Sequence, residues 1–342
     1  MKKILHLTMS GKYGGAETVI FTIINLLQNN YKFYYLCPKG DIELKLASKK
    51  IEYYTFSSQK ELRKVIEYLN PDKIHAHDFK ASVIAGLYKK NETKIISHLH
   101  TDHVWAKKLS LKNLIYFLLS FRFSNIIFVS EKLYDNFKLK KIFINKAKIL
   151  LNALDKKELY LKSNEKIIEK EYDIMFLGRL SAYKNPLKFI EIVKKTIDLK
   201  FDIKAIMIGD GEEKENCLSM IKEYSLEENI DFKGFKENPF PYLKKSKILI
   251  IPSLNEAYGL VALEANVLSK PVIASKVGGL IEVINTEGGI LCEHTEEFIV
   301  EIVKMLDSNE YYLERVRRAK KNSNKFTKID DFIKSINDLY KN

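Results

Sequence analysis

The sequence has few cysteines and no long apolar run. Only three of its 342 residues are cysteines, Cys37, Cys217 and Cys292; they are widely spaced and form no CxxC pair, which favours a reduced protein over a disulfide framework. No apolar stretch reaches the roughly 18 residues that a membrane span needs. The polar residues SGKYGG interrupt the N-terminal segment before an apolar region of signal-peptide length has formed. We therefore expect a cytoplasmic protein, either free or peripheral on the inner face of the cell membrane.

Several catalytic motifs are also missing. The sequence has no GxSxG and no cysteine in an obvious nucleophile setting, which argues against a nucleophilic hydrolase. The glycines after the first predicted strand, Gly11, Gly14 and Gly15, do not match GxGxxG, which weakens the interpretation as a nicotinamide dehydrogenase. There is no DxD motif. We expect an activity that needs no metal ion or other cofactor.

The charge is unbalanced but evenly spread. Lysine and arginine number 57 against 44 aspartates and glutamates, a formal net charge of +13. The basic residues occur in every segment, without a dense basic arm or a basic–aromatic repeat, so we do not expect nucleic acid as a partner. An anionic membrane surface or a phosphate-bearing substrate fits this balance better.

The order of apolar runs predicts the architecture. Hydrophobic residues make up 46% of the chain, enough for two domains of roughly 150 residues with separate cores. Short β-branched runs alternate with helical patterns in 1–155 and again in 171–325. This predicts an α/β fold in which two Rossmann-like, doubly wound parallel-sheet domains face each other across a cleft. We interpret the polar residues 156–170 as a linker and 326–342 as a C-terminal helix that can pack back on the first domain.

The predicted strands locate the candidate site. In the first domain they read KKILHLT, YKFYYLCP, IEYYTF, KIHAH, KIISHLH and NIIFVS; in the second they read YDIMFLG, FDIKAIMIG, NIDFKG, ILIIPS and PVIAS. Ligands of doubly wound sheets collect beyond the carboxyl ends of the strands. Residues that directly follow a strand are therefore the candidates.

Two glutamates follow ILIIPS, in NEAYGLVALEANVLSKPVIA. Glu256 is expected at the strand end, and a helix is expected to start near Gly259, so that the N–H groups of Gly259, Leu260 and Val261 can bind a phosphate. Glu264 lies over a turn into that helix, where a carboxylate can accept two hydrogen bonds from a ribose diol. The alternative is that both glutamates are solvated surface charges.

Two cations follow YDIMFLG. Arg179 and Lys184 suit a diphosphate, and if that diphosphate is a leaving group they also stabilise its growing charge. The alternative is an exposed loop with ordinary basic residues.

The candidates in the first domain are glycines and histidines. Gly14 and Gly15 permit close approach of the backbone to a ligand, although a plain turn explains them too. The histidines end two predicted strands. His–x–His can bind metal, but no carboxylate or cysteine completes a convincing set. We expect His75 and His98 to be core or supporting residues and favour His100, at the strand end, as the functional one. The five histidines are His75, His77, His98, His100 and His103.

Taken in order, these motifs resemble those of the retaining GT-B glycosyltransferases of the GT4 type over nearly the whole chain. The matching stretches are GGAE at 14–17, HAH at 75–77, GRL followed by Lys184 and Asn185, GDG at 209–211, and E-x7-E running into KPVIA. LNALD at 151–155 resembles the family's NGxD stretch, with Ala153 in place of glycine. EAYG stands where EGFG or EAFG is common.

The resemblance implies a substrate and a role for each residue. The donor would be a nucleotide-diphosphate sugar, usually of uridine or guanosine, with a UDP-sugar favoured here; the acceptor would be a glycan or polyprenyl-linked glycan in surface polysaccharide biosynthesis. The departing phosphate oxygen would take the acceptor proton on the same face, so no protein nucleophile is required. The implied contacts are diphosphate with Arg179 and Lys184, ribose with Glu264, donor sugar with Glu256 and His100, sugar and phosphate with the amides of Gly259, Leu260 and Val261, and close approach at Gly14 and Gly15.

The basic, apolar stretch 107–122 has two interpretations. Its leucines could dip into a membrane face, with lysines and Arg122 near lipid phosphates, which would suit a lipid-linked acceptor. Alternatively, it is a core helix against the sheet. The apolar residues concerned are Leu111, Leu114, Ile115, Leu118 and Leu119; the basic ones are Lys107, Lys108, Lys112 and Arg122.

Two other classes of function remain. A sugar-nucleotide epimerase of the same fold would turn over its substrate without an acceptor. A two-lobed, non-enzymatic binding protein would have no need of Glu256 or Glu264.

Overall fold

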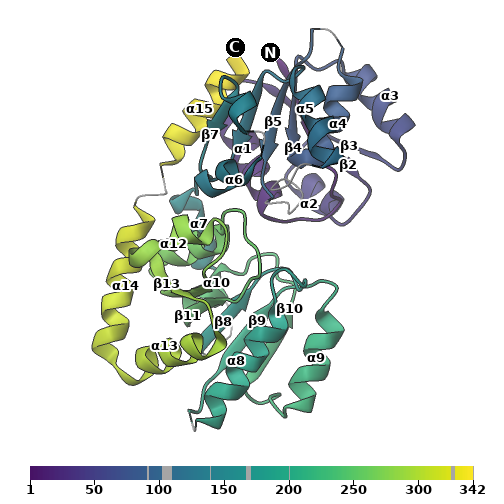
Figure 1. The fold of residues 1–342 in the computed structure, drawn as a ribbon. Coiled ribbons are helices and arrows are strands. Elements are labelled where there is room, and N and C mark those ends of the chain that lie inside the picture. The colour runs from purple at the N-terminus through teal and green to yellow at the C-terminus, as the bar shows by residue number, and fades with distance from the viewer. Residues whose placement is uncertain are drawn as a thin grey trace. The chain divides into compact units, whose positions relative to one another are not determined.

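The computed structural model describes residues 1–90, 92–101, 110–138, 140–166, 171–199, 201–324 and 328–341 (Figure 1). The chain divides into two compact units: unit 1 is Met1–Asn152 with Ile329–Asn342, and unit 2 is Ala153–Lys328. Each unit contains one parallel β-sheet. The predicted α/β class, with two doubly wound parallel-sheet domains, is confirmed.

Unit 1 has a seven-stranded sheet in the order β3-β2-β1-β4-β5-β6-β7. Helices α3, α4 and α5 lie on one face of this sheet, and α1 and α15 lie on the other (Figure 1). Its strands are β1 (Lys3–Leu7), β2 (Lys32–Pro38), β3 (Tyr53–Phe56), β4 (Lys73–His77), β5 (Lys94–Leu99), β6 (Asn125–Phe128) and β7 (Ala147–Ile149). Its helices are α1 (Gly15–Leu27), α2 (Ile42–Ser48), α3 (Gln59–Leu69), α4 (Asp78–Tyr88), α5 (Leu111–Ser120), α6 (Glu131–Asn136), the 3₁₀ helix η2 (Lys140–Phe143) and α15 (Ile329–Lys341).

The central strands of unit 1 are buried along most of their length. Every residue of β4 is buried, and so are the last four residues of β1. Continuous burial is expected for parallel strands covered by helices on both faces. It also explains why these strands read as apolar runs, interrupted here by histidines that pair across the sheet: His6 stands opposite His75, and His77 stands opposite His98.

The C-terminal helix α15 packs on the sheet of unit 1. Its Ile336 and Tyr340 are fully buried. The Tyr31 hydroxyl donates to the side-chain oxygen of Asn337 at 2.6 Å, and the Lys73 ammonium donates to the Leu339 carbonyl at 2.8 Å. A segment more than 250 residues from β4 in the sequence thus completes the core around that strand.

Unit 2 has a six-stranded sheet in the order β10-β9-β8-β11-β12-β13. Its strands are β8 (Tyr172–Leu177), β9 (Ala205–Ile208), β10 (Ile230–Gly234), β11 (Ser246–Ile251), β12 (Val272–Ser275) and β13 (Gly289–Cys292). Its helices are α7 (Lys156–Ser163), α8 (Pro186–Asp198), α9 (Lys214–Glu223), α10 (Phe240–Lys245), α11 (Leu260–Val267), α12 (Leu280–Gly288), α13 (Thr295–Asp307) and α14 (Asn309–Ser323).

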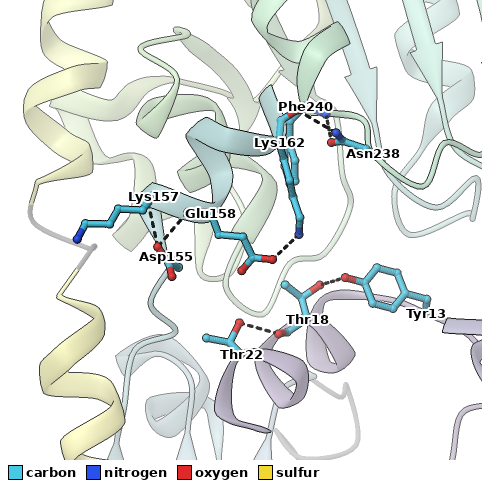
Figure 2. Close-up of polar contacts among 9 residues, drawn as sticks. All are labelled: Tyr13, Thr18, Thr22, Asp155, Lys157, Glu158, Lys162, Asn238 and Phe240. Atoms are coloured by element: carbon cyan, nitrogen blue, oxygen red, sulfur yellow. Dashed lines mark hydrogen bonds and ion pairs between the residues drawn. The ribbon is translucent and has the colours of Figure 1, made fainter. Parts of the chain in front are cut away.

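The structure differs from the sequence analysis at two short strands and at the expected linker, among other places. Strands β7 and β13 were not predicted, because each has only three or four residues and too little apolar pattern to stand out. The expected linker 156–170 begins with helix α7, which belongs to unit 2. A side-chain cap explains that helix: Oδ1 of Asp155 accepts from the N–H of Lys157 at 2.9 Å and of Glu158 at 3.1 Å (Figure 2).

Candidate active site

The candidate residues of unit 2 follow neighbouring strands. Strands β9, β8, β11 and β12 lie side by side in this order and are all parallel. Their carboxyl ends therefore meet at one edge of the sheet, where ligands of doubly wound folds collect. The loops that leave this edge carry the sequences GDG, GRLSAYKN, SLNEAYG and SKVGG.

The loop after β8 is hydrogen-bonded to the loops on both sides of it. The N–H of Leu180 donates to the carbonyl of Asp210 at 2.9 Å, and the N–H of Leu254 donates to the carbonyl of Tyr183 at 2.8 Å. Arg179 extends from this loop with an exposed side chain, and no carboxylate in the described part of the chain pairs with it. The guanidinium is therefore available to an anionic ligand.

Lys184 and Glu256 form an ion pair. The Lys184 ammonium donates to Oε1 of Glu256, and the same oxygen accepts from the Ser253 hydroxyl at 3.1 Å. The Glu256 side chain is 11% exposed and that of Lys184 is 33% exposed. The sequence analysis assigned these residues to different groups of a ligand, without placing them in contact. If both bind the ligand, their pairing has to change when it enters.

Helix α11 begins at Leu260, as predicted, and Gly259 is its N-cap residue. Gly259 has φ +95°, a left-handed conformation that favours glycine, and a Cβ atom there would lie 2.6 Å from the side chain of Leu280. Among the described residues, none accepts a hydrogen bond from the N–H of Gly259, Leu260 or Val261. These three donors and the positive end of the helix dipole are thus open to an anion.

The sequence analysis did not assign the glycine pair that supports the Glu256 loop. The N–H of Gly279 donates to the Glu256 carbonyl at 2.8 Å. Gly278 has φ +49°, and a Cβ atom at that position would lie 1.8 Å from the same carbonyl oxygen. Only glycine permits this contact. The signal available in the sequence was a GG pair in the loop after a predicted strand, as at Gly14 and Gly15.

Glu264 lies in α11 and is half-buried. Within the described residues, no hydrogen-bond donor contacts its carboxyl group. Burial raises the pKa of Glu264 from 4.5 to about 8, and the Lys162 ammonium opposes this shift. The sequence analysis treated Glu264 as a carboxylate, but this pKa leaves it mostly protonated at neutral pH. Lys162 lies on α7 and pairs with Glu158 at 2.7 Å (Figure 2).

In unit 1, Gly14 and Gly15 form the start of helix α1. Gly15 is its first residue, and Gly14 is the N-cap residue with an extended backbone. The carbonyl of Gly14 accepts from the N–H and the hydroxyl of Thr18, each at 3.1 Å. That hydroxyl also contacts the Tyr13 hydroxyl at 2.8 Å (Figure 2). The first turn is therefore held by side chains that flank the glycines.

His100 directly follows β5, and Asp78 holds the backbone there. Oδ1 of Asp78 accepts from the N–H of His100 at 2.7 Å and of Thr101 at 2.9 Å. Asp78 itself has φ +69°, a left-handed conformation that is uncommon outside glycine but that aspartate adopts more readily than most residues. The sequence analysis quoted this aspartate within IHAHD but gave it no role, because its partners lie more than 20 residues away.

The other histidines of unit 1 surround His100. His75 and His98 are fully buried, a position that suits either a core or a supporting residue. Burial lowers the pKa of His6 to about 3 and that of His100 to about 4, so both rings are neutral at pH 7. The sequence analysis found no convincing set of metal ligands, but the described residues bring together two groups: His6, His75 and His77, and His77, His98 and His100. His103 lies outside the described residues.

Two family models match the chain. The model described as Glycosyltransferase Family 4 matches residues 13–156, and the model described as Glycosyl transferases group 1 matches residues 160–326. Together with the two parallel-sheet units, these matches define a GT-B glycosyltransferase, an enzyme of the transferase class. The chain belongs to the GT4 family, as the resemblance of its motifs implied.

Relatives and solved structures agree with this class. The chain is 26% identical to the Campylobacter jejuni N-acetylgalactosamine-N,N'-diacetylbacillosaminyl-diphospho-undecaprenol 4-alpha-N-acetylgalactosaminyltransferase, over 92% of this chain and 93% of that one. It is 25% identical to the Escherichia coli O-antigen biosynthesis glycosyltransferase WbnH, over 93% and 94%. The crystal structure of Anabaena HepE in complex with UDP-glucose has the same fold, with a TM-score of 0.86, 21% identity and complete coverage of both chains.

Proposed function

We propose that this enzyme is a retaining, metal-independent glycosyltransferase that moves a sugar from a UDP-sugar to a glycan or lipid-linked acceptor in surface polysaccharide biosynthesis. The observation that carries the proposal is the convergence of Arg179, the Lys184–Glu256 pair and the α11 amides at one edge of the unit 2 sheet. Two cations and a row of N–H donors suit a diphosphate. HepE has been solved with UDP and with UDP-glucose, and the name of the Campylobacter relative includes a diphospho-undecaprenol-linked sugar.

The donor contacts follow from the positions of these groups. Arg179 and Lys184 bind the diphosphate, and the amides of Gly259, Leu260 and Val261 bind its oxygens and the adjoining sugar. Glu264 accepts from the ribose hydroxyls once it is ionised. Glu256 accepts from hydroxyls of the transferred sugar, which then replace Lys184 as its partner.

The reaction needs charge stabilisation more than a protein nucleophile. The bond between the anomeric carbon and the diphosphate breaks, the bond to the acceptor oxygen forms on the same face, and the acceptor proton goes to the departing phosphate oxygen. Negative charge grows on the diphosphate in the transition state, so the cations and amides bind it more tightly there than in the ground state. Protein groups would thus supply the charge stabilisation that a bound metal ion can provide to a leaving phosphate in other enzymes.

Unit 1 contributes His100, Gly14 and Gly15 to the proposal. The His100 ring is neutral at pH 7, so we assign it a hydrogen bond to a donor-sugar hydroxyl and no charge–charge interaction. Asp78 fixes the backbone that carries it. The glycines leave room for the donor at the start of α1.

Replacing Arg179 by alanine is expected to weaken UDP binding about tenfold, because one charge-assisted contact to the diphosphate is lost. Isothermal titration calorimetry measures this directly. Arg317→Ala, which removes an exposed arginine from α14, is the matched control and should bind UDP like the wild type. Equal affinities in the two variants would refute the assignment of Arg179.

The reaction itself is tested with the wild-type enzyme. Incubation with UDP-sugars and a lipid-linked acceptor should give a product whose anomeric configuration, read by NMR, equals that of the donor, and chelator should not slow its formation. Inversion, or a need for added metal, would contradict the proposal. Turnover of a UDP-sugar without any acceptor would instead indicate the epimerase.

Helix α5 supports a peripheral place on a membrane. It turns its polar and aromatic residues inward, since Asn113, Tyr116 and Ser120 are buried. Four of the five leucine and isoleucine residues singled out in the sequence face solvent, and Leu119 is half-buried, so α5 is not a core helix on that face. The exposed apolar residues are Leu111, Leu114, Ile115, Leu118 and the adjoining Phe121. Lys107 and Lys108 lie outside the described residues.

Basic side chains lie next to this exposed face. A hollow of about 290 Å³ is lined by Lys73, Lys89, Lys94 and Arg122, among others. Arg122 follows Phe121 directly and donates to the Lys89 carbonyl at 3.3 Å. Apolar residues beside a basic hollow suit the surface of an anionic bilayer, where a lipid-linked acceptor resides. No helix among the described residues is long and apolar enough to cross a membrane.

Replacing Leu114 and Leu118 together by glutamate is expected to reduce binding to phosphatidylglycerol vesicles at least fivefold in a flotation assay, because two inserted apolar groups become anions. Leu44→Glu alters a leucine on α2 that is even more exposed and should leave the bound fraction unchanged. If the double variant floats with the vesicles like the wild type, α5 is not the membrane-binding face.

A further inference from the structure

Five histidines and one tyrosine form a hydrogen-bonded network inside unit 1. Tyr340 of α15 is its centre: the Tyr340 hydroxyl lies 2.6 Å from Nδ1 of His75 and 3.4 Å from Nε2 of His6. From these two rings the network continues outward along the sheet. Nε2 of His75 lies 3.1 Å from Nδ1 of His98, and Nδ1 of His6 lies 2.9 Å from Nε2 of His77.

The two arms of the network end on rings that lie close together. One nitrogen from each of His77, His98 and His100 lies within 4.8 Å of the other two, and Nδ1 of His77 is 3.0 Å from Nε2 of His100. Tetrahedral ligation with bonds of about 2.1 Å places ligand nitrogens about 3.4 Å apart, so small side-chain rotations suffice to converge on an ion.

His98, at this end of the network, has one ring nitrogen that makes no hydrogen bond within the described residues. Its Nδ1 is engaged by His75, whereas its Nε2 is buried and has no hydrogen-bond partner among the described residues. Buried polar atoms without a partner are uncommon and call for an explanation. In the other group of three, His6 and His75 each have both ring nitrogens hydrogen-bonded, so no such vacancy exists there.

The network also supplies a consistent arrangement of protons. If His98 carries its proton on Nδ1, it donates to His75, which in turn donates from its own Nδ1 to the Tyr340 oxygen. The buried Tyr340 hydroxyl keeps its own proton and donates it to Nε2 of His6, so His6 donates from Nδ1 to Nε2 of His77. A lone pair then remains on Nε2 of His98, and His77 binds a metal ion through Nδ1 after that nitrogen releases its proton. Metal-binding histidines are commonly oriented by such a hydrogen bond from the second ring nitrogen.

We propose that His77, His98 and His100 bind a divalent transition-metal ion of the zinc type that takes no part in glycosyl transfer. His100 binds it through Nε2, which faces His77, and keeps its Nδ1–H for the donor-sugar hydroxyl. Imidazole nitrogen is a preferred ligand of Zn²⁺, Co²⁺ and Ni²⁺, and three histidines leave a fourth position for water. His6, His75 and Tyr340 form the supporting layer. His100 ends the array outside the strand and is only partly buried, which gives the ion a route in.

The test uses Co²⁺ as a probe of the full chain, free of any affinity tag. Titration should show one ion per chain with the visible absorption of tetrahedral Co²⁺, and Zn²⁺ should displace it. His98→Gln and His100→Gln should each weaken binding at least tenfold. His294→Gln, an exposed histidine of unit 2, is the matched control and should not change it. The readout is metal uptake, so the result does not depend on glycosyl transfer.

Two outcomes would overturn the inference. One is a folded wild-type chain that takes up no Co²⁺ at one equivalent; the other is uptake with equal affinity in the wild type, His98→Gln and His100→Gln. Circular dichroism and thermal unfolding report the fold of each variant. If the buried His98→Gln does not fold, the wild type and His100→Gln decide, because His100 lies beyond the last residue of β5.

Discussion

Glu256→Gln is expected to lower the turnover of glycosyl transfer about a hundredfold to a thousandfold, which is the usual cost of removing one preorganised electrostatic group from a transition state. In the proposed donor complex, the carboxylate accepts hydrogen bonds from the donor sugar and stabilises positive charge on the anomeric carbon. Glutamine preserves the shape and removes the charge. The measurement is the initial rate of product formation at saturating UDP-sugar.

The same substitution should leave the affinity for UDP unchanged or slightly higher. In the proposed donor complex Glu256 contacts the transferred sugar, which UDP lacks. Loss of the Glu256 charge also removes the ion-pair partner of Lys184, so the Lys184 ammonium can bind the diphosphate without competition. Glu293→Gln removes another glutamate that pairs with a lysine of unit 2 and should change neither quantity. A Glu256→Gln enzyme that retains a third of its turnover would refute the assigned contact.

Glu264→Gln is expected to weaken UDP-sugar binding about a hundredfold at pH 9 but only a few-fold at pH 6, because two charge-assisted hydrogen bonds from the ribose are lost only where the carboxylate exists. The pKa of Glu264 in the free enzyme is about 8. Binding to the ionised form therefore releases a proton below that pH. Wild-type affinity should rise by up to tenfold per pH unit as the pH increases toward 8 and level off above it.

Calorimetry checks this prediction through both affinity and proton release. Titrations of a UDP-sugar at pH 6 to 9, in buffers of different ionisation enthalpy, give the number of protons released. Glu264→Gln is its own control, since any ionisation of the ligand or of other groups persists in the variant. Parallel pH profiles for wild type and variant would rule out Glu264 as the ribose acceptor.

The raised pKa also affects folding. The folded-state pKa of Glu264 lies above the unfolded value of 4.5, so the folded protein holds this proton more tightly. The contribution to stability is undiminished below pH 4.5, is lost as the pH rises from 4.5 to 8, and is absent above 8. The same variant should therefore unfold at a higher temperature than the wild type at pH 9 and at a similar temperature at pH 5. Function at this position would cost stability.

Much of the fold was predictable, because the strands of a parallel sheet are buried on both faces and read as apolar runs. Every predicted strand is present in the structure. The missed strands β7 and β13 are short enough that neighbours along the sheet, more than their own residues, define them. Helix α7 was missed because the composition of 156–170 is polar, although Asp155 supplied a capping signal.

Helix α5 shows the limit of periodicity. Its leucines recur at helical spacing, which predicts one apolar face but does not say what covers it. The structure packs the opposite face, with Tyr116 inside, and leaves the leucines in solvent. Amphipathic spacing alone does not distinguish a core helix from one that binds a membrane.

The sequence by itself determined the two doubly wound domains, the strand ends that Arg179, Lys184 and Glu256 follow, and the helix that carries Glu264. It could do so because the alternation of apolar runs and glycine-containing turns acts over short distances along the chain. Only the tertiary structure decided which of these residues touch. The Lys184–Glu256 pair spans 72 positions and the His75–Tyr340 contact spans 265. The pKa of Glu264 likewise depends on burial by surrounding elements. Separation along the chain predicts neither which residues come into contact nor which side chains are buried.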